Sequence, residues 1–229
     1  MSLLSKLRVA DRQPVPAVMH GRGPAMVAEA RAGRPSNGLK EFAWLLDGIE
    51  HGKVLDLGPV WQATVSFFVE RGFRVYTEDL LAAWKLFLGA EEERLRSSKP
   101  DESPEPPGDR ARRFLEANLQ YPAGTFDAVL VWDAFDYVES EAVKRLVVRL
   151  GELLREGGVV LALFHSSKPQ GFHRYRVLDA QNLELMPAAA PCAVQRSYQN
   201  REILNLFARF HSSKTFVGRD QLREGVFIK

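Results

Sequence analysis

Three residues near the start of the chain have the types and the spacing of a nucleotide-binding site. Asp56 and Gly58 close a short apolar run, and Asp79 follows a second run that begins at Phe73. An apolar run of this length predicts a strand buried on both faces of a parallel sheet. Asp79 comes about 20 residues after the turn, the distance that places a carboxylate on a ribose hydroxyl. Residues 53–79 therefore predict half of a nucleotide-binding βαβ unit.

Residues 54–58, VLDLG, with the helix and the acidic residue after them, resemble the first motif of class I S-adenosylmethionine-dependent methyltransferases. In this seven-β-strand family the motif usually runs from a hydrophobic residue through Leu-Asp-Leu-Gly-x-Gly-x-Gly. Val60 and Gln62 stand where the family has its other two glycines. Glycine suits such turns because it adopts positive φ freely and lets a ligand approach the backbone. Either the loop has another conformation that still admits the cofactor, or the pocket has closed.

The resemblance implies S-adenosylmethionine as the cofactor and assigns residues to it. Asp56 and Gly58, with Pro59 beside them, would hold the methionine end through the turn. Asp79, with Leu80 after it, would bind the ribose hydroxyls. These assignments follow from the place of each residue in the family's motif.

Residues 111–138 contain a second block that looks like the family along its length. The apolar pair at 114 and 115 suggests a strand that ends near Asn118, and residues 126–132 predict the next strand. Asn118 falls where the family commonly has an aspartate that accepts a hydrogen bond from the adenine amino group, and an amide oxygen can accept the same bond. The backbone N–H of Leu119 would face the adenine ring. Asn118 could instead be a turn residue that bonds to its own backbone.

Polar residues follow this strand at the sheet edge where ligands bind in open α/β folds. Trp132 and Asp133 end the strand, and Asp136 and Tyr137 come just after it. All four are candidates for contacts with the cofactor's amino group or with the substrate. The alternative is that Asp133 or Asp136 only caps the helix that follows.

His165 emerges at the same edge, after the next predicted strand. Methyl transfer needs little from the protein beyond placement, because the sulfonium already supplies the leaving group, so the absence of a catalytic triad does not argue against it. His165 or Tyr137 would orient or deprotonate the acceptor. His165 could also be a loop histidine without chemistry.

The remaining pattern predicts the elements that hold these residues. Apolar residues at helical spacing predict helices, and an apolar run predicts a fifth strand at 159–164. Residues 212–229 predict two strands, and the family ends its sheet with such a hairpin, whose last strand inserts antiparallel beside the fifth. We therefore expect an α/β fold with a Rossmann-like doubly wound sheet of about seven strands, mostly parallel, with a C-terminal antiparallel hairpin. The predicted helices are 39–50, 80–96, 139–158 and 199–210.

Residues 39–229 are expected to form one methyltransferase-like domain. Residues 1–38, interrupted by prolines, predict an N-terminal arm or a lid over the cofactor or substrate. Residues 97–110 hold no apolar side chain except proline and predict a mobile surface loop. Residues 166–198 match no motif and are interpreted as a substrate-side insertion. The contacts of the lid would be Met19, His20 and Arg22.

The composition is that of a globular protein, with 229 residues, 45% hydrophobic content and a net charge of +2. So small a net charge makes nucleic acid an improbable partner, and no apolar stretch is long enough for a membrane span or a secretory signal. The single cysteine, Cys192, excludes an internal disulfide and favours a cytoplasmic setting. No histidine or cysteine spacing indicates a metal, and the oligomeric state stays open.

Two functional hypotheses follow from these residues. The first is an S-adenosylmethionine-dependent methyltransferase with a small-molecule acceptor. The second is a methyltransferase-like protein without catalysis that serves as a binding or regulatory module, which Val60 and Gln62 favour and Asp79 and Asn118 disfavour. A nicotinamide dehydrogenase is disfavoured by the single turn glycine and by the C-terminal hairpin.

Overall fold

The structure, a computed structural model, describes residues 33–97 and 105–229. The predicted lid contacts Met19, His20 and Arg22 lie outside the described residues. The domain begins earlier than residue 39, because Arg34–Pro35 already forms a short strand, β1.

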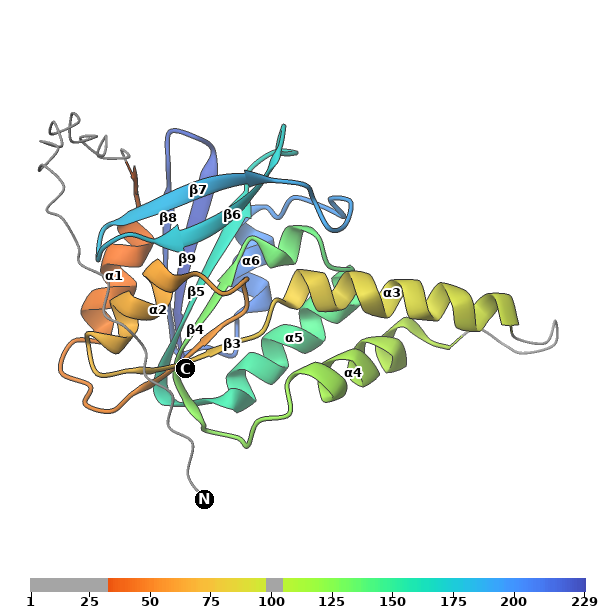
Figure 1. Cartoon of the computed structure of the whole chain (residues 1–229), viewed down its shortest axis with the longest axis horizontal. Helices are drawn as coiled ribbons and strands as arrows, with labels where there is room; N and C mark the ends of the chain where they lie inside the picture. Colours follow the sequence, from red (N-terminus) through yellow and green to blue (C-terminus); the bar gives the residue numbers. More distant parts are fainter. Residues whose placement is uncertain (1–32, 98–104) are drawn as a thin grey trace, which may run out of the picture. The chain divides into compact units, whose positions relative to one another are not determined.

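Within the described residues, the main sheet has six strands. Their bounds are β2 (Lys53–Asp56), β3 (Arg74–Thr77), β4 (Phe126–Trp132), β5 (Leu154–His165), β8 (Ser212–Val217) and β9 (Leu222–Ile228). The order across the sheet is β3-β2-β4-β5-β9-β8 (Figure 1). The first four strands are parallel, and β9 runs antiparallel between β5 and β8. The Rossmann-like α/β prediction is confirmed, and so is the C-terminal hairpin.

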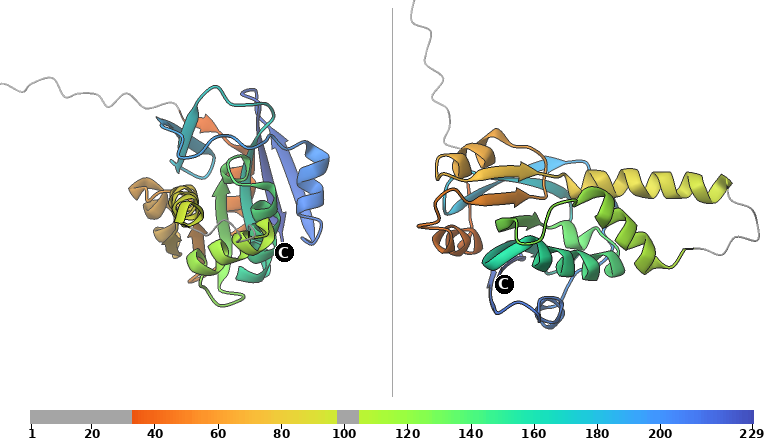
Figure 2. Two further views of the ribbon diagram at one scale, coloured as in Figure 1. Left: turned by 90° about the vertical axis from the view of Figure 1, so that its right-hand side faces the viewer. Right: turned by 90° about the horizontal axis from the view of Figure 1, so that it is seen from below.

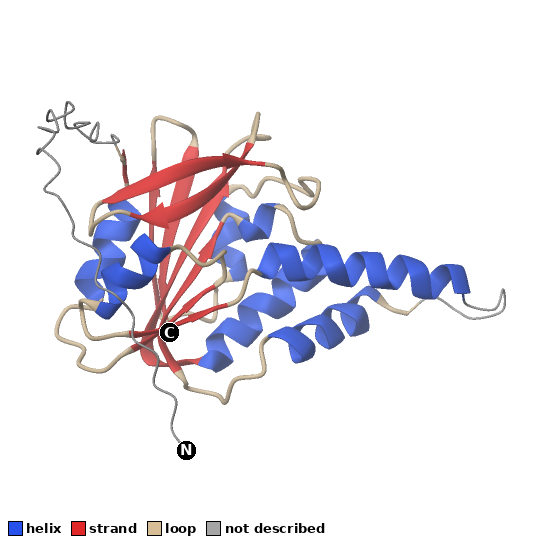
Figure 3. Cartoon of the chain, in the orientation of Figure 1, coloured by secondary structure: helices blue, strands red, loops and turns tan. Residues whose placement is uncertain are grey.

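Helices cover both faces of this sheet (Figures 1 and 3). Their bounds are α1 (Asn37–Leu45), α2 (Gln62–Val69), α3 (Leu80–Ser97), α4 (Pro107–Asn118), the 3-10 turn η1 (Ala134–Asp136), α5 (Ser140–Leu153) and α6 (Asn200–Leu206). Side chains alternate along each strand, so Val54 packs with α1 and α2 whereas Leu55 packs with α3 to α6. The doubly wound arrangement follows from this alternation, because each face carries its own apolar core.

A second, smaller sheet lies over the carboxyl ends of the main strands (Figures 1 and 2). It consists of β1, β7 (Asn182–Ala188) and β6 (Phe172–Val177), all antiparallel. Tyr175, Val177 and Leu183 from this sheet are buried in the same core as α1 and α2. The predicted insertion at 166–198 therefore contains a β-hairpin that packs on the domain.

The predicted strand that ends near Asn118 is wrong, since Pro107–Asn118 forms α4. Ala111, Phe114 and Leu115 recur at helical spacing and are buried on one face. Proline suits the first turn of a helix, where its missing N–H has no intrahelical partner in any case. Because a helix replaces that strand, the sheet has six strands rather than about seven. The helix also shortens the predicted loop at 97–110, of which residues 98–104 lie outside the described residues.

The predicted helix at 139–158 also ends early, at Leu153. Leu154 has a ψ of 142° and pairs with Phe126 as the first residue of β5. The chain therefore passes from helix to strand without the expected glycine stop. Gly157 lies within β5 instead, where it has a left-handed φ of 76°. The helices at 39–50 and 199–210 are confirmed with shorter bounds.

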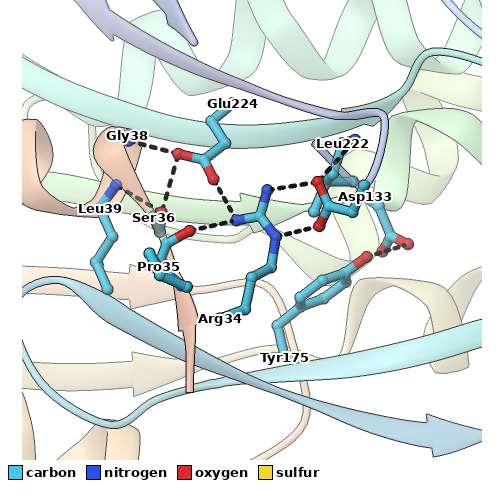
Figure 4. A network of polar contacts seen from close by, with 10 residues as sticks. Arg34, Pro35, Ser36, Gly38, Leu39, Asp133, Tyr175, Leu222 and Glu224 are labelled. Carbon is cyan, nitrogen blue, oxygen red and sulfur yellow. Dashed lines mark hydrogen bonds and ion pairs between the residues drawn. The ribbon is translucent and has the colours of Figure 1, made fainter. Parts of the chain in front are cut away.

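A buried acid joins the start of the domain to its last strand (Figure 4). Glu224 on β9 is 2% exposed, and its Oε2 accepts hydrogen bonds from the Ser36 hydroxyl at 3.0 Å and the Gly38 backbone N–H at 2.5 Å. The Arg34 guanidinium pairs with the other oxygen and with Asp220. A Cβ on Gly38 would lie 2.7 Å from the Glu224 Cβ, so glycine is required for this approach. The network fixes β1 and α1 on the sheet.

No helix in the described ranges has the length and apolar character needed to cross a membrane. These same residues bring no three His, Cys, Asp or Glu side chains together as a metal-binding group. Burial raises the pKa of the Cys192 thiol, which keeps it in its less reactive protonated form.

Candidate cofactor and active site

The Asp56 carboxylate lies at the carboxyl end of β2 and is almost fully buried. Its Oδ1 accepts a hydrogen bond from the Gly58 backbone N–H at 2.9 Å and from the Trp132 indole N–H at 2.6 Å. Burial raises the pKa of Asp56 to about 6, these two hydrogen bonds oppose the rise, and the charge of Asp79 adds to it. Three residues assigned to the cofactor thus contact one another directly.

Gly58 has to be glycine because the Trp132 indole lies against it. A Cβ at position 58 would come within 2.6 Å of Trp132 Nε1. Trp132 itself has a φ of 56°, a left-handed backbone that is uncommon for a non-glycine residue and costs roughly 1–3 kcal/mol. The close approach that glycine allows is therefore used here by the protein's own side chain.

The turn itself differs from a glycine-rich one. In the described ranges, the non-glycine residues with positive φ are His51, Trp132 and Gln221. Val60 is therefore not in a left-handed conformation, and its side chain is 68% exposed. The loop therefore has another conformation, and the side chains around it decide whether the cofactor is admitted.

Asp79 follows β3 and begins α3, where its Oδ1 accepts a hydrogen bond from the Ala82 backbone N–H at 3.1 Å. The same oxygen accepts one from the Arg174 guanidinium at 3.0 Å, which forms an ion pair. Leu80 is buried, and its N–H bonds to the Leu57 carbonyl oxygen. The carboxylate predicted to bind ribose is thus occupied by an arginine from β6.

Tyr175, also on β6, fills the space beside Asp133. Its ring stacks on Trp132, with the centroids 5.8 Å apart and the planes 7° from parallel. Its hydroxyl donates to Asp133 Oδ2 at 3.2 Å (Figure 4). Burial raises the pKa of Asp133 to about 7, the nearby His165 opposes the rise, and the charge of Asp136 adds to it.

His165 is held at the end of β5 by Asp136. Its Nδ1 lies 2.9 Å from Asp136 Oδ2, and its backbone N–H donates to the same oxygen at 2.8 Å. Asp133 Oδ2 lies 3.9 Å from Nδ1. Burial lowers the pKa of His165, but the hydrogen bond with Asp136 and the charges of Asp133, Asp136 and Asp220 outweigh it, so the pKa is raised overall.

The other predicted catalytic residue, Tyr137, is buried at the end of η1. Its hydroxyl has no hydrogen-bond partner among the described residues. Burial raises the pKa of Tyr137, with the charges of Asp133 and Asp136 adding to the effect. A phenol held in its protonated form is a poor base, so His165 is the better candidate for that role.

Asp136→Asn is expected to lower the pKa of His165, because burial then acts on the imidazole without the neighbouring charge. The ring proton shifts of His165, followed by NMR across pH 5 to 9, measure this change. Asp133→Asn serves as the comparison and is expected to have a smaller effect, since its carboxylate is 3.9 Å from Nδ1 rather than 2.9 Å. An unchanged His165 titration in Asp136→Asn would contradict the role of Asp136.

Asn118 and Leu119, assigned to adenine, lie at the end of α4. The Asn118 amide donates to the Phe114 carbonyl oxygen at 2.8 Å, and the Leu119 N–H donates to the Leu115 carbonyl oxygen at 2.8 Å. Within the described ranges, no hydrogen bond or ion pair connects either residue with the groups around Asp79. The N–H groups of both residues bond within α4, and their adenine role stays a prediction.

Arg174 is the site residue that sequence reasoning missed, because it lies in the segment 166–198 that matches no motif. The signal that could have found Arg174 is the alternation of charged and apolar residues over 174–177, RYRV, which predicts a strand with one packed face. That pattern does not indicate which carboxylate an arginine on the strand would meet.

The space between these side chains is a cavity of about 10 Å³. Its walls come from the turn after β2, the end of β4 and strand β6, and include Gly58, Pro59, Trp132, Arg174 and Tyr175. Pockets for drug-sized ligands are typically about 300–1,000 Å³, and about 10–15 Å³ is needed for a single water. The residues at this edge, as they are arranged, do not fit S-adenosylmethionine.

No protein-family model matches the chain, and no curated protein matches it. Among solved structures, it is similar to a 1,6-didemethyltoxoflavin-N1-methyltransferase of Burkholderia thailandensis with bound S-adenosylhomocysteine, at 18% identity and a TM-score of 0.45 over 84% of this chain and 78% of that one. It is also similar to the glycopeptide N-methyltransferase MtfA with S-adenosylmethionine, at 15% identity and a TM-score of 0.42, covering 90% and 99% of the two chains. An S-adenosylmethionine-dependent methyltransferase of Mesorhizobium loti is similar at 15% identity and a TM-score of 0.43, over 82% of this chain and 96% of that one.

At these identities the similarity concerns fold alone. The last strand, β9, lies antiparallel beside β5, as the sequence resemblance predicts. The chain has a Rossmann-like α/β fold. The carboxyl edge of its main sheet is covered by the chain's own β6–β7 hairpin.

Proposed function

We propose that this chain is an S-adenosylmethionine-dependent methyltransferase that acts on a small-molecule acceptor. The observation that supports it most directly is β9, which lies antiparallel between β5 and β8. A nicotinamide dehydrogenase is not expected to end its sheet in this way. Asp56 and Asp79, at the carboxyl ends of neighbouring strands, support the same cofactor, because they occupy the motif positions for its methionine end and its ribose.

The residues offered to the acceptor are His165 and the aspartates behind it. Because Nδ1 of His165 faces Asp136, Nε2 is the ring nitrogen that can take a proton from an acceptor hydroxyl or amine. Asp136 would hold the ring in this orientation and stabilise the imidazolium once it forms. The side chain of His165 is 15% exposed, so it remains in reach of a small molecule at the edge.

In a background that already carries Arg174→Ala, so that no ion pair is lost with the carboxylate, Asp79→Ala is expected to weaken binding of S-adenosylhomocysteine at least tenfold, because a charged hydrogen-bond acceptor contributes about 1.5–3 kcal/mol. Calorimetric titration measures the affinity. Asp79→Asn controls for the fold, since asparagine also caps a helix, and Asp109→Ala removes an acid from the first turn of α4 instead. Equal affinity in Arg174→Ala with and without Asp79→Ala would rule out the ribose role.

The second candidate function is a methyltransferase-like module without catalysis. The cavity of about 10 Å³ and the Arg174–Asp79 ion pair favour it. Under this alternative no variant of the edge binds S-adenosylhomocysteine, even when the edge has been opened. The two candidates therefore differ in the affinity of an opened variant rather than in that of the unsubstituted protein.

A further inference from the structure

The cofactor edge of this chain is filled from β6, a strand that is hydrogen-bonded to β7 and not to the main sheet. We propose that the Phe172–Tyr175 end of β6 is an autoinhibitory plug, and that this end has to move away from the edge before the cofactor can bind. This inference rests on the proposed function. The plug acts through Arg174 and Tyr175, which hold the groups that the cofactor would otherwise contact.

Arg174 takes the place of the ribose. It reaches Asp79 from a position 95 residues away in the sequence and bonds to it at 3.0 Å. Asp79 is neither deeply buried nor paired with any other cation among the described residues. This Oδ1 already accepts from the Arg174 guanidinium and from the Ala82 N–H, so a ribose hydroxyl pair that bonds to both carboxylate oxygens competes with the guanidinium for Oδ1.

Tyr175 and Trp132 take the space next to it. Tyr175 is 2% exposed and Trp132 is 5% exposed, and their stacked rings close the space between Asp133 and the turn at Gly58. The left-handed φ of Trp132 is an unfavourable backbone conformation that this packing maintains. Removing the tyrosine ring takes away one side of the stack and the hydrogen bond to Asp133 together.

The opposite end of β6 holds the hairpin on the domain. The Val177 N–H donates to Thr64 Oγ1 on α2 at 3.0 Å, and the side chains of Val177 and Leu183 are fully buried. On the side of the plug the hairpin meets the domain through side chains, namely those of Arg174, Tyr175 and the buried Phe172, whose ring lies edge-on to Tyr137 with the centroids 5.1 Å apart. The anchored end can therefore stay in place while the plug end moves.

Arg174→Ala tests the plug. Apparent affinity falls by the fraction of molecules that are open, so Arg174→Ala and Tyr175→Ala are each expected to bind S-adenosylhomocysteine at least tenfold more tightly than the unsubstituted protein. Arg155→Ala is the matched control, because it breaks an arginine–aspartate pair with Asp127 near the start of β5, away from the plug. Titration calorimetry gives the affinities, and hydrogen exchange of the β6 amides reports whether the plug end is released.

The outcomes separate the plug from the proposed function. Tighter binding in Arg174→Ala but not in Arg155→Ala supports both. Equal affinity in all variants, or weaker binding in Arg174→Ala, overturns the plug and leaves the proposed function standing, since the arginine is then neutral or a ligand. If no variant binds S-adenosylhomocysteine although the β6 amides exchange faster, the proposed function is overturned, and the plug with it. If no variant binds S-adenosylhomocysteine and the β6 amides do not exchange faster, the contacts of Arg174 and Tyr175 do not hold the edge closed. This result overturns the plug alone.

Discussion

Glu224→Ala is expected to lower the free energy of unfolding by about 3–5 kcal/mol, the range measured when one partner of a buried ion pair is removed. Glu224 is 2% exposed and accepts hydrogen bonds from Ser36, Gly38 and Arg34. Alanine leaves all three donors without this acceptor, and the Arg34 side chain is only 13% exposed. Urea unfolding followed by circular dichroism measures the change.

Asp220→Asn is the matched control, because Asp220 is the other acid on Arg34 but its side chain is 42% exposed. A pair with so exposed a partner is expected to contribute about 1 kcal/mol or less. If the two variants lose similar amounts, the network around Glu224 does not fix β1 and α1 in the way that its burial indicates. A loss confined to Glu224→Ala would support the network as the main attachment of these elements.

The second large effect is a dependence of stability on pH that Asp56 causes. Burial raises the folded-state pKa of Asp56 from 3.8 to about 6. Between these two values the folded state binds more protons than the unfolded state, so stability falls as pH rises. A difference of about 2 pKa units corresponds to about 3 kcal/mol.

Asp56→Asn removes this titration while keeping an oxygen that can accept from Gly58 and Trp132. The variant is expected to gain about 3 kcal/mol relative to the unsubstituted protein between pH 4 and pH 7. The charges of Asp133, Asp136 and His165 are present in both proteins, so the comparison isolates position 56. Urea unfolding at several pH values gives both curves.

Asp179→Asn supplies a control of opposite sign. Hydrogen bonds from Asn182 and the Gln181 backbone N–H lower the pKa of Asp179. The Asp179 carboxylate stabilises the folded state above its unfolded-state pKa, and this stabilisation is lost as pH falls. The unsubstituted protein is therefore expected to become more stable than Asp179→Asn as pH rises. If the free energy of unfolding depends on pH in the same way in Asp56→Asn and in the unsubstituted protein, the folded-state pKa of Asp56 is not raised.

The sequence by itself determined most elements of the main sheet and the edge at which the polar residues meet. Periodicity is a local property, so the apolar run at 126–132 and the alternation in 212–229 were sufficient to predict β4 and the last two strands. Parallel strands then bring Asp56, Asp133 and His165 to one edge. The pattern failed at 114–118, where an apolar pair fits a strand and a helix equally well.

Only the tertiary structure decided what fills that edge. Trp132 reaches Asp56 from 76 residues away, and Arg174 reaches Asp79 from 95 residues away. Which long side chain meets which carboxylate depends on how a hairpin packs over the strand ends, and no local period encodes that packing. The motif residues Asp56, Gly58 and Asp79 are the same in an open and a closed site, so they predict where a cofactor would bind but not whether the space is free.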